Sequence, residues 1–159
     1  MNKFIAYTDG SSSPRSEHQI GGWGFVIYPL GSPEMALESS GAEQSTTNQR
    51  MEMMGIIKAC EFANNLAGEY EVGLHVVSDS RYCLDGIQDW IHGWKRNGWS
   101  KSGCPIKNLD LWQQMYILVY ESNIKCTFEW VKDHSGDRWN DVADRLATEA
   151  KHELKRQLL

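Results

Sequence analysis

The sequence predicts an α/β fold in which helices pack on a mixed β-sheet, in a single domain of 159 residues. The first 41 residues hold three short apolar runs separated by glycine, proline and serine, which is typical of an antiparallel meander. Beyond residue 45, segments of helical periodicity alternate with short apolar strands, as in a sheet with crossover helices. The sequence shows no internal repeat and no low-complexity linker that would mark a second domain.

The first predicted strand covers residues 4–8, where side chains alternate between two faces. Tyr7 and Asp9 project to the same side, and a turn rich in glycine, serine and proline follows. Residues 22–28 form the second predicted strand, which a proline and a glycine end, and residues 35–41 form the third.

A helix is predicted to begin at one of the capping residues 45–47, because Thr46 and Gln49 fit the capping-box pattern. Apolar side chains recur at helical spacing from Met53 onward, and the helix is expected to end between residues 64 and 68. The later elements are expected in this order: a strand at 74–77, a helix that contains residues 82, 84 and 87, a basic, tryptophan-rich segment, a helix that contains residues 111, 115, 118 and 119, a strand at 124–131, and a last helix that contains residues 143, 146, 147, 150 and 154.

The composition is that of a globular protein and excludes several classes. Apolar residues make up 41% of the chain and charged residues 23%, a balance that argues against intrinsic disorder. No apolar run approaches the ~18 residues of a membrane span, and Asp9 interrupts the segment in which a secretory apolar core would form. The four cysteines lack the close pairs of a zinc site, and a disulfide framework is not expected. We therefore expect a reduced, cytoplasmic compartment.

Positive charge is concentrated in one segment of an otherwise acidic chain. The formal net charge is −5, yet residues 90–109 contain four lysines or arginines and no acidic residue. A local basic patch of this kind attracts polyanions even on an acidic protein. The alternative interpretation is a solvent-exposed helix face with no ligand.

Four carboxylates occupy positions that packing alone does not favour. Asp9 and Asp79 end two predicted strands, and neighbouring strands of one sheet would bring their side chains together. Glu52 lies one turn inside the first predicted helix, beside its apolar stripe, and Asp144 borders the apolar face of the last helix. Each has an ordinary structural explanation as a turn, capping or partly exposed acidic residue, and Asp141 competes with Asp144.

The four carboxylates matter more together than singly. If they converge on one point, each raises the pKa of the others, and a bound cation makes the arrangement tolerable at neutral pH. Oxygen-only ligands favour hard ions such as Mg²⁺ or Mn²⁺. Two such ions about 4 Å apart activate water and stabilise the leaving oxygen in phosphoryl transfer.

Seven segments of the sequence match, in order, the motifs of one known family. They are YTDGS at 7–11, TTNQRME at 46–52, SDSRY at 78–82, WIHGWKRNGW at 90–99, KNLDLW at 107–112, HSGD at 134–137 and NDVADRLA at 140–147. In these segments the chain resembles the type 1 ribonuclease H family, in its compact bacterial or phage-like form. The segments cover nearly the whole chain, and together they are highly specific.

The resemblance implies a ribonuclease H-like fold: a five-stranded mixed sheet, three strands antiparallel and then parallel strands, flanked by helices. It implies one catalytic domain over residues 1–159 with a basic protrusion at about 90–109. The implied activity is endonucleolytic hydrolysis of the RNA strand of RNA–DNA hybrids by two-metal-ion catalysis, leaving 5′-phosphate and 3′-hydroxyl ends. The implied cofactor is Mg²⁺, two ions per active site with substrate bound, and Mn²⁺ is a possible substitute.

The resemblance also assigns catalytic roles. The family's metal-binding carboxylates correspond to Asp9, Glu52, Asp79 and Asp144. Ten residues separate His134 from Asp144, which is the family's spacing and selects Asp144 over Asp141. His134 would assist proton transfer or product release; otherwise it is an exposed loop histidine.

Substrate contacts are implied for two regions. Residues matching Asn48 and Gln49 contact the hybrid in the family, and Arg81 stands where a glutamine is usual and would add a phosphate contact. Capping and solvent-facing polarity would also explain these three side chains. The basic protrusion resembles the family's handle, whose cations bind DNA phosphates; the implied contacts there are Trp90, Lys95, Arg96, Trp99, Lys101 and Asn108. Packing explains most of its tryptophans better than stacking on bases does, although Trp99 would help to shape a groove for the backbone.

The chain departs from the family at some positions. The loop at 12–19 has a different composition, so its contacts with RNA cannot be carried over. Asp133 stands where a glycine is usual, which would alter the mobility of its loop. Because Asp9 lies so close to Met1, no additional hybrid-binding module is expected before it, and affinity would depend on the handle. We expect a monomer.

Three alternatives stay open. The same fold serves DNA-cutting resolvases and transposases, although the handle and the Asn48–Gln49 pair match the ribonuclease group. A hybrid-binding protein with an inactive site is a second alternative, which the presence of all four carboxylates disfavours. A domain of a reverse transcriptase is the third.

Overall fold

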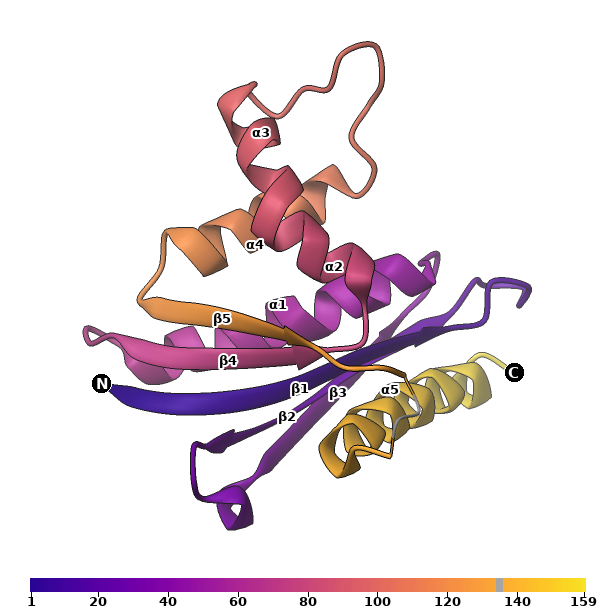
Figure 1. Ribbon diagram of the computed structural model, residues 1–159. Helices are drawn as coiled ribbons and strands as arrows, with labels where there is room; N and C mark the ends of the chain where they lie inside the picture. The colour runs from indigo at the N-terminus through magenta and orange to yellow at the C-terminus, as the bar shows by residue number, and fades with distance from the viewer. Residues whose placement is uncertain (134–135) are drawn as a thin grey trace.

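The computed structural model describes residues 1–133 and 136–159 and shows a five-stranded sheet with helices on both faces (Figure 1). The strands are β1 (Asn2–Ser12), β2 (Gly21–Pro29), β3 (Leu37–Glu43), β4 (Val72–Ser78) and β5 (Ile124–Trp130). Their order in the sheet is β3-β2-β1-β4-β5. The first three strands pair antiparallel, and β4 and β5 run parallel to β1. The predicted mixed α/β sheet is therefore confirmed.

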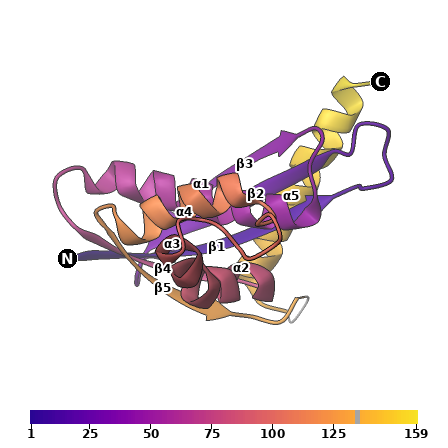
Figure 2. The same cartoon turned by 90° about the horizontal axis from the view of Figure 1, so that it is seen from above.

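The helices are η1 (Pro33–Met35), α1 (Asn48–Ala67), α2 (Arg81–Asp85), η2 (Gly86–Trp90), α3 (Ile91–Arg96), α4 (Leu109–Tyr120) and α5 (Arg138–Gln157). Helices α1 and α5 cover opposite faces of the sheet, and α2 to α3 rise away from it as a protrusion (Figure 1). Figure 2 shows α4 beside α1. Over the ranges that the structure describes, no helix is long and apolar enough to cross a membrane.

Several boundaries differ from the predicted ones, and two of the differences bear on the site. Strand β1 continues past Asp9 because its ladder with β2 runs on to the Ser12–Gly21 pair, so this carboxylate lies inside the strand. Helix α1 is capped by Thr47, whose side chain accepts a hydrogen bond from the amide of Arg50 at 3.2 Å. Thr46, the cap that the sequence pattern favoured, is buried beneath this turn.

Glycines allow both covering helices to approach the sheet closely. A Cβ at Gly10 would lie 2.3 Å from the backbone nitrogen of Glu52, and one at Gly55 would lie 2.9 Å from the carbonyl oxygen of Asp9. The backbones of α1 and β1 therefore touch, and this contact sets Glu52 beside Asp9. On the opposite face, a Cβ at Gly24 would meet α5 at 2.7 Å, so α5 is held equally close.

The base of the protrusion is a cluster of aromatic rings. Trp112 of α4 is fully buried, and the ring of Trp94 lies 5.6 Å from it between centroids. Trp90 packs against both rings but remains 41% exposed. Trp99 packs edge-on against Tyr116 at 5.8 Å. Packing thus accounts for these tryptophans, while the exposed part of Trp90 stays accessible to a ligand.

The substitution Gly86→Ala is expected to lower the free energy of unfolding by about 2–4 kcal/mol. The new Cβ would lie 2.0 Å from the ring of Trp112, which cannot retreat from the packed core. Gly93→Ala is the matched control in the same helical segment, because its new Cβ would meet nothing closer than 3.8 Å. Alanine stabilises a helix by up to about 1 kcal/mol relative to glycine, so this variant should not be destabilised. Urea denaturation measures the free energy of unfolding of both variants. Equal changes in the two variants would contradict the proposal that the packing of Trp112 on Gly86 excludes a side chain at residue 86.

Candidate active site

An open cavity of about 380 Å³ lies where the carboxyl end of β4 meets β1 and the first turns of α1 and α2. Five of its lining residues are carboxylic acids, and the others are polar or aromatic apart from one glycine. The lining residues are Asp9, Gly10, Asn48, Gln49, Glu52, Asp79, Ser80, Arg81, Tyr82, Asp133 and Asp144. The sequence prediction that acidic residues gather at this edge of the sheet is consistent with the cavity.

Three carboxylates form the centre of the cavity. One oxygen from each of Asp9, Glu52 and Asp79 lies within 4.8 Å of the other two. Asp9 comes from β1 and is 3% exposed, Glu52 comes from α1 and is 8% exposed, and Asp79 follows β4. The amide of Gly10 donates to Oδ1 of Asp9 at 2.9 Å, which holds that carboxylate in place.

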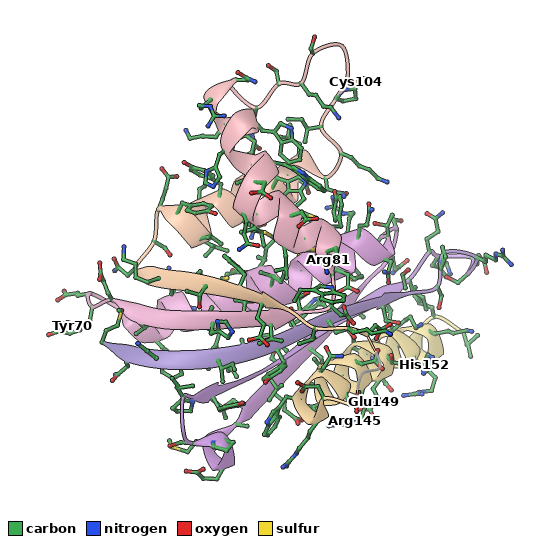
Figure 3. All side chains as sticks on the ribbon, in the orientation of Figure 1. Tyr70, Arg81, Cys104, Arg145, Glu149 and His152 are labelled. Atoms are coloured by element: carbon green, nitrogen blue, oxygen red, sulfur yellow. The ribbon has the colours of Figure 1, made fainter. Side chains whose placement is uncertain are left out.

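Asp144 of α5 joins this group from the opposite face of the sheet. Asp144 lines the cavity and raises the pKa of Asp9, whereas the competing residue Asp141 is exposed in the first turn of α5 and does not line the cavity. The next residue, Arg145, pairs with Glu38 and Glu149 rather than with the cavity; Figure 3 shows Arg145 and Glu149 together on α5. His134, the proposed proton-transfer residue, lies outside the described residues.

Burial and mutual repulsion raise the pKa values of the three central acids. Desolvation and then the charge of Asp79 raise the pKa of Asp9 to about 8, against an opposing hydrogen bond from Gly10. Burial raises the pKa of Glu52 well above its ordinary value, and the neighbouring Asp9 and Asp79 raise it further. Burial, and then Asp133, raise the pKa of Asp79 to about 6. Ionising the whole group is therefore costly unless a cation compensates for it.

The donor set fits a hard divalent cation. Each central residue offers carboxylate oxygen, the ligand type that Mg²⁺ and Mn²⁺ take in proteins. Oε2 of Glu52 is buried and has no hydrogen-bond partner among the described residues, which would be an unfavourable state for a carboxylate without an ion. The residues present therefore fit a metal ion held between the three carboxylates.

Sequence reasoning missed one acidic residue of the cavity, Asp133. It lines the same cavity as Asp79, and its carboxylate raises the pKa of Asp79. The pairing of Ser78 with Trp130 places the ends of β4 and β5 side by side, and Asp133 follows only three residues later. The rule that parallel strands gather functional groups at their carboxyl ends could have found this residue.

Arg81 lies where the protrusion meets the sheet (Figure 3) and also lines the cavity. Its guanidinium stacks 4.0 Å from the ring centroid of Trp130, a cation–π contact. The indole nitrogen of Trp130 donates to the carbonyl oxygen of Asp79 at 3.1 Å. Strand β5 thus holds the chain segment that carries Asp79.

A second cavity of about 580 Å³ adjoins the acidic one and shares Gln49 and Tyr82 with it. Apart from Gly93 and Ile106, its remaining lining is aromatic, polar or basic: Trp90, Trp94, Asn97, Ser100, Lys101, Ser102 and Lys107. Two of the sequence-predicted handle contacts, Trp90 and Lys101, are therefore brought together with Gln49.

The other predicted handle contacts do not line this cavity. Lys95 and Arg96 are exposed on α3, and Lys95 lies 5.6 Å from the ring of Tyr116. Asn108 has a left-handed backbone and donates to the hydroxyl of Tyr82 at 3.0 Å, so its side chain supports the wall of the cavity.

Comparison with known proteins agrees with this geometry. The RNase H family model matches residues 1–152. A Ribonuclease H of Ruthia magnifica subsp. Calyptogena magnifica is 42% identical over 148 residues, which cover 92% of this chain and 94% of that protein. A Ribonuclease H of Francisella philomiragia subsp. philomiragia is 40% identical over 154 residues, which cover 96% and 93%.

A solved structure shares the fold as well. The crystal structure of LC9-RNase H1, a type 1 RNase H with the type 2 active-site motif, superposes with a TM-score of 0.82 at 29% identity, over 96% of this chain and 74% of that one. The chain therefore belongs to the ribonuclease H family and to its type 1 branch, enzymes that degrade the RNA strand of RNA–DNA hybrids.

Proposed function

We propose that this chain, as one catalytic domain, is a Mg²⁺-dependent endonuclease that cuts the RNA strand of RNA–DNA hybrids and leaves 5′-phosphate and 3′-hydroxyl ends. The observation that carries this proposal is the group of three carboxylates, Asp9, Glu52 and Asp79, which each place one oxygen within 4.8 Å of the other two. One oxygen of Glu52 is buried and has no hydrogen-bond partner among the described residues. Membership of the ribonuclease H family supports an RNA–DNA hybrid as the substrate, and the acidic cavity supports metal-dependent hydrolysis.

Asp9, Glu52 and Asp79 would hold a divalent ion, and Asp144 would extend the site beside Asp9. Ions bound there would activate a water molecule and stabilise the leaving 3′-oxygen. The protein keeps these ligands in place through the close contact between α1 and β1 and through the hydrogen bond from Gly10 to Asp9. His134 would assist proton transfer or product release, as the family resemblance implies.

The paired cavities match the two strands of a hybrid. Gln49 is half-buried between them, and exposed Asn48 lines the acidic side, so both amides can reach 2′-hydroxyls and base edges of RNA. Lys101 in the second cavity would bind phosphates of the DNA strand, and the exposed part of Trp90 would contact its sugars or bases. The further proposed contacts are Arg81, Lys95, Arg96, Trp99 and Asn108.

The central test is a cleavage assay on an end-labelled RNA–DNA hybrid with Mg²⁺, with Mn²⁺ and with chelator. We expect metal-dependent cutting of the RNA strand, which Asp79→Asn slows by roughly 10²-fold or more, the scale seen when one electrostatic group of a site is removed. The exposed carboxylate of η2, changed in Asp89→Asn, is the control and should leave the rate unchanged.

Duplex RNA, duplex DNA and single-stranded RNA serve as competing substrates in the same assay. Cutting of duplex or branched DNA instead of the hybrid would replace the proposed substrate with that of a resolvase-like enzyme. Tight hybrid binding without any cutting would identify a binding protein with an inactive site.

The raised pKa of Asp9 predicts a pH-dependent stability in chelator. The unfolded chain releases this proton near pH 4, whereas the folded chain keeps it up to about pH 8. The folded state therefore binds more protons over this interval, and the free energy of unfolding falls as pH rises. Relative to the wild-type protein, Asp9→Asn should raise the free energy of unfolding by on the order of 2 kcal/mol at pH 8.5. This difference should become smaller as the pH falls towards 4.

Thermal melts in chelator across pH 4–9 measure this difference between the variant and the wild-type protein. Asp89→Asn should show no comparable trend, because its carboxylate is exposed. A difference between Asp9→Asn and wild type that does not change with pH would contradict the proposed repulsion.

The second cavity predicts salt-dependent affinity for the hybrid. Changing Lys101 and Lys107 together to glutamine should weaken binding several-fold and reduce the slope of log K against log salt by about 1–2. Lys125→Gln is the control, because Lys125 of β5 forms an ion pair with Glu71 and lines neither cavity. Binding isotherms at several salt concentrations measure the slope, and an unchanged slope would contradict a phosphate contact here.

A further inference from the structure

We infer that Asp133 is an additional metal ligand on the Asp79 side of the cavity, and that it lets this chain hold a second divalent cation before nucleic acid binds. The inference rests on the proposed metal dependence and extends it to a residue that the family resemblance does not assign. In the family that position is usually a glycine, which has no ligand atom to offer.

The position of Asp133 is set by backbone contacts. The amide of Val131 donates to the carbonyl of Ser78 at 3.0 Å, which extends the pairing of β4 and β5 beyond the strand end. The Trp130 indole binds the carbonyl of Asp79, the residue that directly follows β4. Asp133 follows within two residues of this anchored segment. It is exposed, it lines the cavity, and its carboxylate raises the pKa of Asp79.

Two further carboxylates flank the central three. Asp9, Glu52 and Asp79 each have one oxygen within 4.8 Å of the other two, and they suffice for one ion. Asp144 raises the pKa values of Asp9 and Asp79, and Asp133 raises those of Asp79 and Glu52. The donor set is therefore larger than one small cation requires, and it extends away from the centre in two places.

The negative charge of the ionised lining residues exceeds the positive charge of one divalent ion. Among the lining residues that the structure describes, five carboxylates face a single cation, Arg81, whose guanidinium stacks on Trp130. When all are ionised, a net charge of −4 remains, which one divalent ion would halve and a second would neutralise. Independently of this count, Oε2 of Glu52 is buried and has no hydrogen-bond partner among the described residues, which favours a cation at this oxygen.

In a two-metal nuclease, a substrate phosphate bridges the ions and supplies negative charge to both. Asp133 would supply such a charge from the protein itself. The affinity for the second ion would then depend less on bound nucleic acid than it does in a chain without this carboxylate.

The test is a titration of Mn²⁺ into the substrate-free protein, by calorimetry and by electron paramagnetic resonance of the unbound ion. Wild type should bind two ions, and Asp133→Asn should lose the weaker one or bind it at least about tenfold less tightly. Asp141→Asn is the matched control, an exposed carboxylate in the first turn of α5 outside the cavity, and should bind like wild type. Melting curves in chelator verify that each variant is folded.

The outcomes separate the two proposals. If wild type and Asp133→Asn bind the same number of ions with the same affinity, or if wild type binds one ion only, Asp133 is not a ligand for a second ion and the central metal site stands. If wild type binds no ion at all, the proposed metal dependence fails and the role of Asp133 fails with it.

Discussion

The contact between the backbones of α1 and β1 is the constraint on which the rest of the site depends. Gly10 and Gly55 remove the side chains that would hold the two elements apart, so Glu52 reaches Asp9 inside a buried region. This proximity is unfavourable for two carboxylates, and Asp79 adds a third charge within 4.8 Å. The fold accordingly stores electrostatic repulsion that a bound cation would relieve.

The second feature of the molecule is the juxtaposition of opposite charges across Gln49 and Tyr82. An acidic cavity lies on one side of this pair, and a cavity with two lysines and exposed aromatic surface lies on the other. A net charge of −5 therefore does not prevent interaction with a polyanion, because the charges are segregated. We propose that the acidic side takes the RNA strand, together with metal ions, and that the basic side takes the DNA strand.

Much of this arrangement was predictable from local pattern. Period-2 runs identified the strands, period-3.6 runs identified the helices, and strand ends indicated that Asp9 and Asp79 would meet. The extent of β1 was not predictable, because its ladder with β2 crosses a glycine- and serine-rich segment that reads as a turn. Asp144 could not be told from Asp141 by pattern alone, and the resemblance decided it. Asp133 was missed although it follows the carboxyl end of β5, as Asp79 follows that of β4. The structure adds the pairing of Ser78 with Trp130, which places these two strand ends side by side.

The most direct measurement of the central claim is anomalous scattering from crystals soaked in Mn²⁺. We predict that the strongest anomalous peak lies between Asp9, Glu52 and Asp79, within coordination distance of all three. The absence of a peak there at saturating Mn²⁺, or ions bound only to exposed carboxylates such as Glu149 and Glu153, would contradict the account. In that case the buried acids would have to be neutralised by protons, and the proposed chemistry of this cavity would be lost.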